Sequence, residues 1–406
     1  MFKKMILLTI FLVLSQNSFA FELSKSSESI ELQGLLKVWE YADQGDADAQ
    51  ATLGKMYFYG YGVPQDYTKA LSWSLKSAEQ GNIAAQYSVA IMYFRAYGVP
   101  QDYAKAEMWF RRAAEQGDTS AQAQLGVMYF DGLGVLKDYV QAFSWLQKSA
   151  EKNDPDAEAQ LGVMYLYGKG VAQDYVQALS WLHKAAEQGQ IEAQTKLGVM
   201  AEKGQGSAQD YIQAVAWYRK AAEQGNAEAQ VRLGVMYING YGVPQDYIQA
   251  SSWISKSAEQ GNADAEAQLG WMYYFGHGVN NDYTLAANWS LRGAKQGNAN
   301  AQAMLGGMYI LGYGVPKDYV QALSWSRKGA EQGDAQSQFQ LGTLYFNGQG
   351  VPPNVMSAYI CFILSAPTNS DAIKARDELT PRFSKNDINK AQAVAANWKV
   401  GTPLPF

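Results

Sequence analysis

The chain has 406 residues, of which 48% are hydrophobic and 17% are charged, so it contains enough apolar side chain to build a core. Acidic residues outnumber basic ones, and the formal net charge is −5. An acidic chain argues against nucleic acid or an anionic membrane as a partner, because both require a basic surface. Cys361 is the only cysteine, so the chain folds without an internal disulfide.

The first 20 residues have the pattern of a secretory signal peptide. Lys3 and Lys4 precede the apolar run 5–14, and Ser18-Phe19-Ala20 matches a small-x-small cleavage site. We expect cleavage after Ala20 and a periplasmic or secreted protein with a net charge of −7, because two lysines are lost. No later stretch has the roughly 18 continuous apolar residues that a membrane span needs. The alternative, a single N-terminal membrane anchor, stays open.

A pattern of 36 residues repeats along the rest of the chain. Its composite form is A-x-A-Q-x-x-L-G-x-M-Y-x-x-G-x-G-V-x-x-D-Y-x-x-A-x-x-W-x-x-K-A-A-E-Q-G-N. The pattern predicts nine repeats over residues 46–369, preceded by a flexible leader at 21–31 and a capping helix at 32–45. Residues 370–406 are predicted to form two C-terminal capping helices and a loose tail. The nine units are anchored at Leu53, Val89, Leu125, Leu161, Leu197, Leu233, Leu269, Leu305 and Leu341.

Each unit is predicted to be two short helices joined by a glycine corner. In the first unit, Gly60 and Gly62 end the first helix with positive φ, and Asp66 caps the second. Two such helices cannot bury both apolar faces alone, but stacked units can. A tyrosine and a tryptophan recur at fixed places on the second helix, and we predict that both series belong to the core. They are Tyr67, Tyr103, Tyr139, Tyr175, Tyr211, Tyr247, Tyr283 and Tyr319, and Trp73, Trp109, Trp145, Trp181, Trp217, Trp253, Trp289 and Trp325.

The repeat closely resembles the Sel-one-like repeat, a relative of the tetratricopeptide repeat. The resemblance covers about fifteen positions per unit over residues 47–369. It implies an all-α, right-handed superhelical α-solenoid that acts as an adaptor for other proteins, and exported bacterial members are linked to host interaction. A cysteine-rich subset of the family is described as penicillin-binding or β-lactamase-like. This chain departs from that subset, because it lacks the paired cysteines of each repeat.

Residues that could support catalysis are few and scattered. His183 and His277 are the only histidines, and they lie in different units without clustered partners. Ser149 and Lys152 form a β-lactamase-like Ser-x-x-Lys, but the same place in other units also holds Ser or Ala. Cys361 replaces a tryptophan of the series and is expected to be a buried, inert thiol. We therefore assign no catalytic, cofactor-binding or metal-binding residue, and we expect no cofactor.

Binding in a repeat protein is expected at positions that vary while the frame repeats. By analogy with related solenoids, the first helices should line the concave side. Exposed aromatic and arginine side chains there are the usual interface anchors. For Tyr274, packing in the core is an equally open alternative. The candidate contacts are Tyr59, Tyr61 and Arg95 near one end, and Trp271, Tyr274, Phe275 and Tyr313 near the other.

Two functions remain open at this point. The first is an exported, monomeric scaffold that binds a protein or peptide, in the cell envelope or at a host surface. The second is a cell-wall-active enzyme of the penicillin-binding or β-lactamase-like kind. The sequence favours the scaffold, because the repeated motif accounts for its own glycines, aspartates and aromatics as structure.

Overall fold

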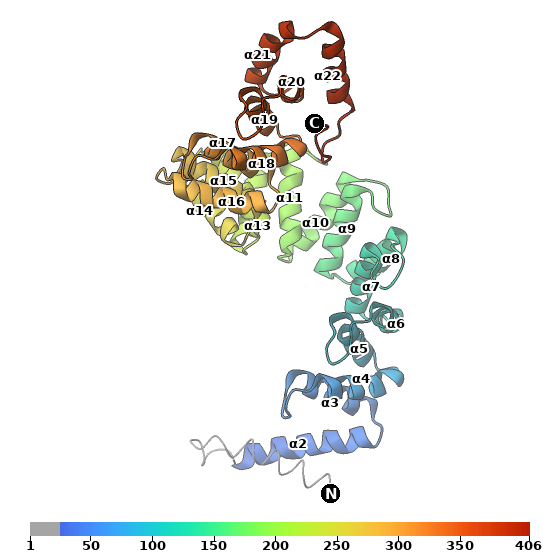
Figure 1. Cartoon of the computed structure of the whole chain (residues 1–406). Helices are drawn as coiled ribbons and strands as arrows, with labels where there is room; N and C mark the ends of the chain where they lie inside the picture. The colour runs from blue at the N-terminus through green and yellow to red at the C-terminus, as the bar shows by residue number, and fades with distance from the viewer. Residues whose placement is uncertain (1–24) are drawn as a thin grey trace. The chain divides into compact units, whose positions relative to one another are not determined.

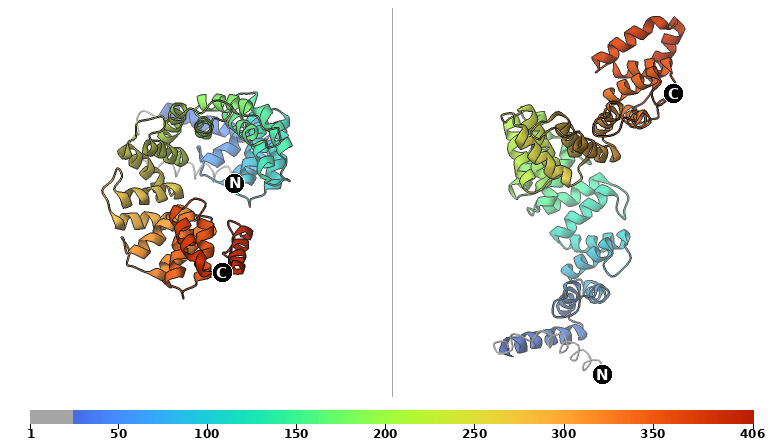
Figure 2. Two further views of the ribbon diagram at one scale, coloured as in Figure 1. Left: turned by 90° about the horizontal axis from the view of Figure 1, so that it is seen from above. Right: turned by 60° about the vertical axis from the view of Figure 1, so that its left-hand side comes forward.

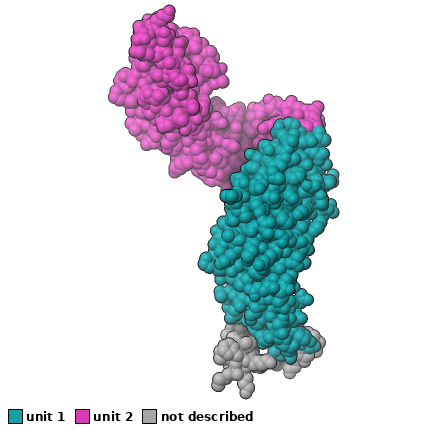
Figure 3. All heavy atoms as spheres, turned by 90° about the vertical axis from the view of Figure 1, so that its right-hand side faces the viewer, with its two compact units in different colours: residues 1–193 teal, residues 194–406 magenta. Residues whose placement is uncertain are grey.

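The computed structural model describes residues 25–406, and side chains from residue 34 onward. The predicted signal peptide lies outside the described residues. Within residues 25–406 all regular secondary structure is helical, which confirms the all-α solenoid of stacked helix pairs (Figure 1). The chain forms two compact units that meet within one helix, after Ala193 (Figure 3). In both units helices that follow one another in the chain pack side by side, for example α3 (Ala47–Tyr59) with α4 (Tyr67–Glu79) and α15 (Ala263–Phe275) with α16 (Tyr283–Lys295) (Figure 2).

Every repeat contributes a first and a second helix. The first helices all have 13 residues: α3 (Ala47–Tyr59), α5 (Ile83–Arg95), α7 (Thr119–Asp131), α9 (Pro155–Tyr167), α11 (Ile191–Lys203), α13 (Ala227–Asn239), α15 (Ala263–Phe275), α17 (Ala299–Leu311) and α19 (Ala335–Asn347). The second helices are α4 (Tyr67–Glu79), α6 (Tyr103–Glu115), α8 (Tyr139–Ala150), α10 (Tyr175–Glu187), α12 (Tyr211–Glu223), α14 (Tyr247–Glu259), α16 (Tyr283–Lys295), α18 (Tyr319–Glu331) and α20 (Val355–Ser365).

The predicted helix boundaries are confirmed by the caps. Asp66 caps α4 by accepting a hydrogen bond from the Lys69 amide at 3.0 Å. That bond, more than the Lys69 ammonium, lowers the pKa of the Asp66 carboxyl. Gly60 and Gly62 have φ of 76° and 68°, in the left-handed region that a residue with a Cβ enters only with strain.

Glycines also permit two close contacts that set the spacing of the helices. A Cβ added at Gly234, inside α13, would overlap the side chain of Ile254 on α14 of the same unit. A Cβ added at Gly278, the second corner glycine, would overlap the carbonyl of Tyr247 in the preceding unit. The contact at Gly234 lets the two helices of one repeat pack closely, and the contact at Gly278 lets one repeat pack closely against the next.

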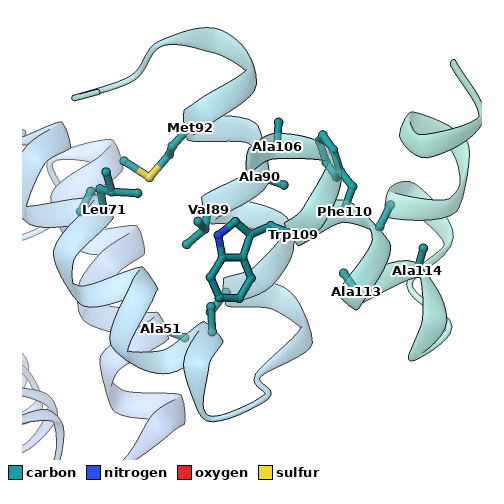
Figure 4. Close-up of a cluster of buried hydrophobic side chains, with 14 of the residues drawn as sticks. Ala51, Leu71, Val89, Ala90, Met92, Ala106, Trp109, Phe110, Ala113 and Ala114 are labelled. Atoms are coloured by element: carbon teal, nitrogen blue, oxygen red, sulfur yellow. The ribbon is translucent and has the colours of Figure 1, made fainter. Parts of the chain in front are cut away.

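The core follows the anchor positions, as predicted for the first helices. Leu53 and Val89 are fully buried, and near the N-terminus the labelled apolar side chains of successive helices converge around Trp109 (Figure 4). The tryptophan series needs a correction, because only Trp109 and Trp145 are buried and the others are half-buried. A lysine or arginine three residues later covers the outer face of each ring, with cation-to-centroid distances from 3.9 Å at Lys148 to 4.6 Å at Arg112.

The tyrosine series is half-buried as well, and Tyr283 is 38% exposed, so the prediction that these rings are core is also corrected. Several of the rings stack on the residue between the corner glycines of the following unit. Tyr211 stacks on Tyr241 with centroids 4.8 Å apart, and Tyr247 stacks on His277 at 4.6 Å. The rings therefore join neighbouring units at the surface of the stack.

A series of buried glutamines forms a hydrogen-bonded spine through the repeats. Gln86 on α5 donates to the Ala78 carbonyl of the preceding helix at 3.2 Å, and Gln116 at the end of α6 donates to Gln86 at 2.8 Å. The same pair recurs as Gln230 and Gln260. Where the pair is present, the first helix is tied both to the helix before it and to the one after it. Gln86 and Gln230 are nearly solvent-free, whereas their partners Gln116 and Gln260 are exposed.

The two ends of the array differ from the prediction, at residues 25–31 and in the tail after α22. α2 spans Lys25–Asp43, so residues 25–31 are helical where the sequence predicted a flexible leader. The C-terminal cap consists of α21 (Ser370–Leu379), the short 3-10 helix η1 (Thr380–Arg382) and α22 (Lys385–Asn397), which Ser384 caps as predicted.

The tail after α22 is packed, not loose. Leu404 is buried, the Phe406 ring lies 5.7 Å from that of Tyr345, and the Gly401 amide donates to the Glu331 carbonyl at 2.7 Å. The tail is held because its apolar side chains cover surface on α18 and α19. Within residues 25–406, no helix combines the length and the apolar character needed to cross a membrane.

Substitution of the second corner glycine by alanine should lower the free energy of unfolding by more than backbone strain alone accounts for. Gly261 lies in the turn after α14, outside the corner, and serves as the reference. It has φ of 82° with open space around it, so Gly261→Ala should lower the free energy of unfolding by about 1 kcal/mol. Gly278→Ala adds the overlap with Tyr247 and should cost at least about twice as much. Urea unfolding followed by circular dichroism measures both, and equal losses would contradict the proposed contact between units.

A second prediction concerns Glu158, which occupies a glutamine position of the spine and is 1% exposed. It accepts a hydrogen bond from Gln188 at 2.7 Å, but its carboxylate cannot donate to the Ala150 carbonyl as glutamine does. Burial raises the pKa of the Glu158 carboxyl, although the Lys184 ammonium opposes the shift. Glu158→Gln should therefore raise the free energy of unfolding at neutral pH by about 1 kcal/mol.

The sign of the pH dependence follows from the raised pKa. The protonated Glu158 is favoured in the folded state, so its contribution is fully present below the ordinary pKa of 4.5 and is lost as the pH rises through the folded value. The advantage of glutamine should thus shrink in acid. Glu266→Gln is the control, because Arg292 pairs with Glu266 at 2.8 Å and already donates to the Ala258 carbonyl. No gain at Glu158, or an equal gain at both sites, would contradict this account.

Candidate binding surface

Two pockets open on the first-helix surface of the second compact unit. The larger, of about 570 Å³, is lined by α13, α15, α17 and the start of α19, and we call it the apolar pocket. Its walls include Trp271, Tyr274, Phe275, Met304 and Leu311. Phe275 and Leu311 are each 53% exposed, so apolar surface is open to solvent there. The structure therefore brings three of the predicted contacts, Trp271, Tyr274 and Phe275, to one pocket.

His277 lies beside this pocket and is enclosed by aromatic rings. Its imidazole is 4.6 Å from the Tyr247 ring, 4.8 Å from Trp271 and 5.9 Å from Phe275. The imidazole packs as an aromatic ring and holds Trp271 and Phe275 in place along the pocket wall. In the described part of the chain, no group of three or more His, Cys, Asp or Glu side chains is placed to hold a metal ion.

Tyr274 fits both readings that the sequence left open. It is half-buried and contacts Tyr283 at 5.2 Å, and it also lines the apolar pocket. Burial, with smaller effects of Tyr283 and Tyr313, raises the pKa of the Tyr274 hydroxyl. Tyr313 is placed differently: it stacks on Tyr283 at 4.7 Å, at the corner that joins two units, and 39% of it stays exposed.

The second pocket, of about 490 Å³, is the more polar of the two and is lined by α13, α15, the start of α17 and Glu202 of α11. Arg232 is bound on two sides, at 3.0 Å from Glu228 and 3.4 Å from Glu202. Glu202 also accepts a hydrogen bond from the Tyr218 hydroxyl at 2.5 Å, and burial together with this bond raises the pKa of Tyr218. Asp264 completes the charged lining and accepts from the Asn298 amide at 2.7 Å.

The predicted contacts of the first compact unit gather around Tyr87. Tyr59 stacks on Tyr61 at 5.3 Å, and both are more than half exposed. Tyr59 and Tyr87 line a small pocket of about 100 Å³, and Arg95 and Tyr87 line one of about 410 Å³. Burial raises the pKa of the Tyr87 hydroxyl, and the Arg95 guanidinium opposes that shift. Acidic side chains on the far wall of the larger pocket are Asp154, Asp156 and Glu192.

Two neighbouring positions of the repeat line the pockets but were not among the contacts predicted from the sequence. Tyr87 and its counterparts lie two positions before Leu-Gly, where most units carry alanine, and the next position holds Gln124, Arg232 and Met304. These side chains line the pockets of both units. The variation at these positions is visible in the sequence. Whether the side chains face a pocket depends on which face of the helix the neighbouring repeat leaves open.

The residues considered for catalysis have structural roles. Ser149 is fully buried and its hydroxyl donates to the Thr119 carbonyl at 3.0 Å, as Ser77 and Ser257 donate in their own units. Lys152 donates to the Gly117 carbonyl at 2.6 Å. Cys361 is fully buried, and burial raises the pKa of its thiol, which disfavours the thiolate that a nucleophile needs.

The fold defines a class: an α-solenoid built from tandem two-helix repeats, with several pockets along the first helices. The Sel1 repeat family model matches nine successive segments that together run from residue 47 to residue 366. The segments are 47–82, 83–118, 119–154, 155–190, 191–226, 227–262, 263–298, 299–334 and 335–366. The chain therefore belongs to the Sel1 repeat family, which confirms the resemblance found in the sequence.

Two solved structures support this membership over most of the chain. The first is c5321, described as a protective antigen present in uropathogenic Escherichia coli strains displaying an SLR fold. It is 31% identical, with 90% of this chain and 94% of that chain covered and a TM-score of 0.57. The second is a Sel1 repeat protein from Oxalobacter formigenes, 32% identical, with 86% and 91% covered and a TM-score of 0.54. No curated protein matches the chain.

Proposed function

We propose that this protein is an exported scaffold that binds a protein or peptide partner through its first helices. The observation that carries the proposal is the location of the pockets. Most of them lie on the first helices, and their lining includes side chains that differ from repeat to repeat, such as Arg232, Trp271 and Phe275. The positions that repeat are used mainly for caps, corners and the glutamine spine. Sel1 repeats generally bind proteins, and aromatic side chains that are partly exposed around a pocket are typical of binding hot spots.

Export is the second part of the proposal. It rests on the basic, apolar and small-residue segments of residues 1–20. The relative from uropathogenic E. coli is described as a protective antigen, and a role at the envelope or toward a host fits that description. The acidic balance of the chain supports a protein partner over a nucleic acid. We propose that the mature chain is a monomer without a cofactor.

An enzymatic role of the penicillin-binding kind, which the resemblance to the cysteine-rich subset suggested, gains no support from the two candidate nucleophiles. The Ser149 hydroxyl donates a hydrogen bond to a carbonyl of its own repeat, and Cys361 lies in the core of the last repeat. These two residues therefore favour the scaffold function.

The binding surface can be tested by site-specific photocrosslinking in the cells that produce the protein. A photoreactive phenylalanine analogue at Phe275 should crosslink to a discrete partner, because this side chain lines the apolar pocket. The same analogue at Ile248, 71% exposed on the second helix α14 of the preceding repeat, is the matched control and should give little crosslinked product. Equal crosslinking from both positions, or none from Phe275, would count against the first-helix surface.

Export can be tested independently of binding. The protein from the exported fraction should begin at Phe21, as determined by N-terminal sequencing. Leu8→Arg interrupts the apolar run and should leave the uncleaved chain in the cytoplasm, because the apolar core of a signal peptide is what the export machinery recognises. An exported fraction that retains Met1, or export that is unaffected by Leu8→Arg, would show that these residues are not a cleaved signal.

A further inference from the structure

The polar and apolar pockets of the second compact unit are parts of one groove. Both are lined by Val235, Ala267, Gln268 and Asn300, so the two pockets adjoin. The groove runs over the first helices α13, α15 and α17, with Glu202 of α11 on its polar side and the start of α19 on its apolar side. We call it the α13–α19 groove.

The polar side of the groove carries more negative than positive charge. Among its lining residues, Glu202, Glu228 and Asp264 are acidic and Arg232 is basic. Arg232 is shared by the two glutamates. Asp264 is exposed and its hydrogen bond from Asn298 comes from an uncharged amide, so its charge is not neutralised by that partner. A cation placed on this side of the groove is attracted, and an anion is repelled.

The apolar side lies within reach of the same ligand. Trp271, Phe275 and Leu311 present partly exposed apolar surface, and the aromatic rings of the first two can also accept a cation on their faces. Between the two sides, Gln268 and Asn300 carry amide groups that can both donate to and accept from a peptide backbone. A peptide in an extended or helical conformation has polar backbone groups and can carry charged side chains next to apolar ones, which is the combination that the groove offers.

We propose that the α13–α19 groove binds a peptide segment in which apolar side chains lie next to lysine or arginine. The inference rests on the proposed function and adds the chemistry of the partner. The choice follows from charge complementarity: an acidic segment would bring its carboxylates close to Asp264 and Glu228, and the cost of desolvating like charges opposes binding. A wholly polar basic segment would leave Trp271 and Phe275 uncovered.

The test uses the purified chain and three short fluorescein-labelled peptides with the same leucines and phenylalanines. In one peptide the remaining polar positions are lysine, in the second glutamate and in the third glutamine. Fluorescence anisotropy at low and high salt measures the dissociation constants. The lysine peptide should bind about tenfold more tightly than the glutamate peptide at low salt, and high salt should reduce the difference.

Two pairs of variants locate the binding. Asp264→Lys should weaken the lysine peptide about tenfold, whereas Glu259→Lys makes the same charge change on an exposed residue of α14 and should leave affinity within about twofold. Phe275→Ser should weaken all three peptides about tenfold, whereas Ile248→Ser removes an even more exposed apolar side chain outside the groove and should not. Circular dichroism melting of each variant confirms that it is folded.

The outcomes separate this inference from the proposed function. Equal binding of the lysine and glutamate peptides, with loss on Phe275→Ser, would overturn the charge preference and leave a peptide-binding groove. Binding that none of the groove variants weakens would place the contact elsewhere and overturn the site. No binding of any peptide would also overturn the inference, while crosslinking at Phe275 would still decide the scaffold function.

Discussion

The contact on which the stack depends is the one between the second corner glycine of a repeat and the backbone of the repeat before it. At Gly278 a Cβ would overlap the Tyr247 carbonyl, so the corner can approach only as glycine. This approach brings the residue between the glycines onto the preceding tyrosine ring, as His277 lies on Tyr247. Because the Gly-x-Gly corner and the 13-residue first helices recur at a constant spacing of 36 residues, successive repeats meet in the same register.

Because the repeats share one register, the same polar and aromatic contacts recur from repeat to repeat. The glutamine spine satisfies amide and carbonyl groups that would otherwise be buried without partners, and each tryptophan receives a cation from one turn further along its helix. These interactions use the second helices and the buried edge of the first. The exposed edge of the first helices has no part in them, and that is where the residues vary and where the pockets open.

The sequence predicted the helices and most of the frame, because caps, corner glycines and apolar spacing are local signals. Asp66, Gly60 and Ser384 act as predicted. It was less successful where a partner is distant in the chain. The tryptophans were assigned to the core although most are half-buried, and the tail was expected to be loose although Phe406 packs on Tyr345. Both differences arise from neighbours that periodicity alone does not identify.

Sequence alone determined the class of the protein, the number of repeats and the residues that could vary, because a strict 36-residue repeat leaves little freedom in how its helices pair. Only the tertiary structure decided which variable residues share a surface. It brought Trp271 and Phe275 to one pocket, moved Tyr313 to a corner stack and revealed Tyr87 and Arg232 as lining residues. The reason is physical: whether a side chain on a helix is buried, stacked or open depends on how closely the neighbouring repeats approach it.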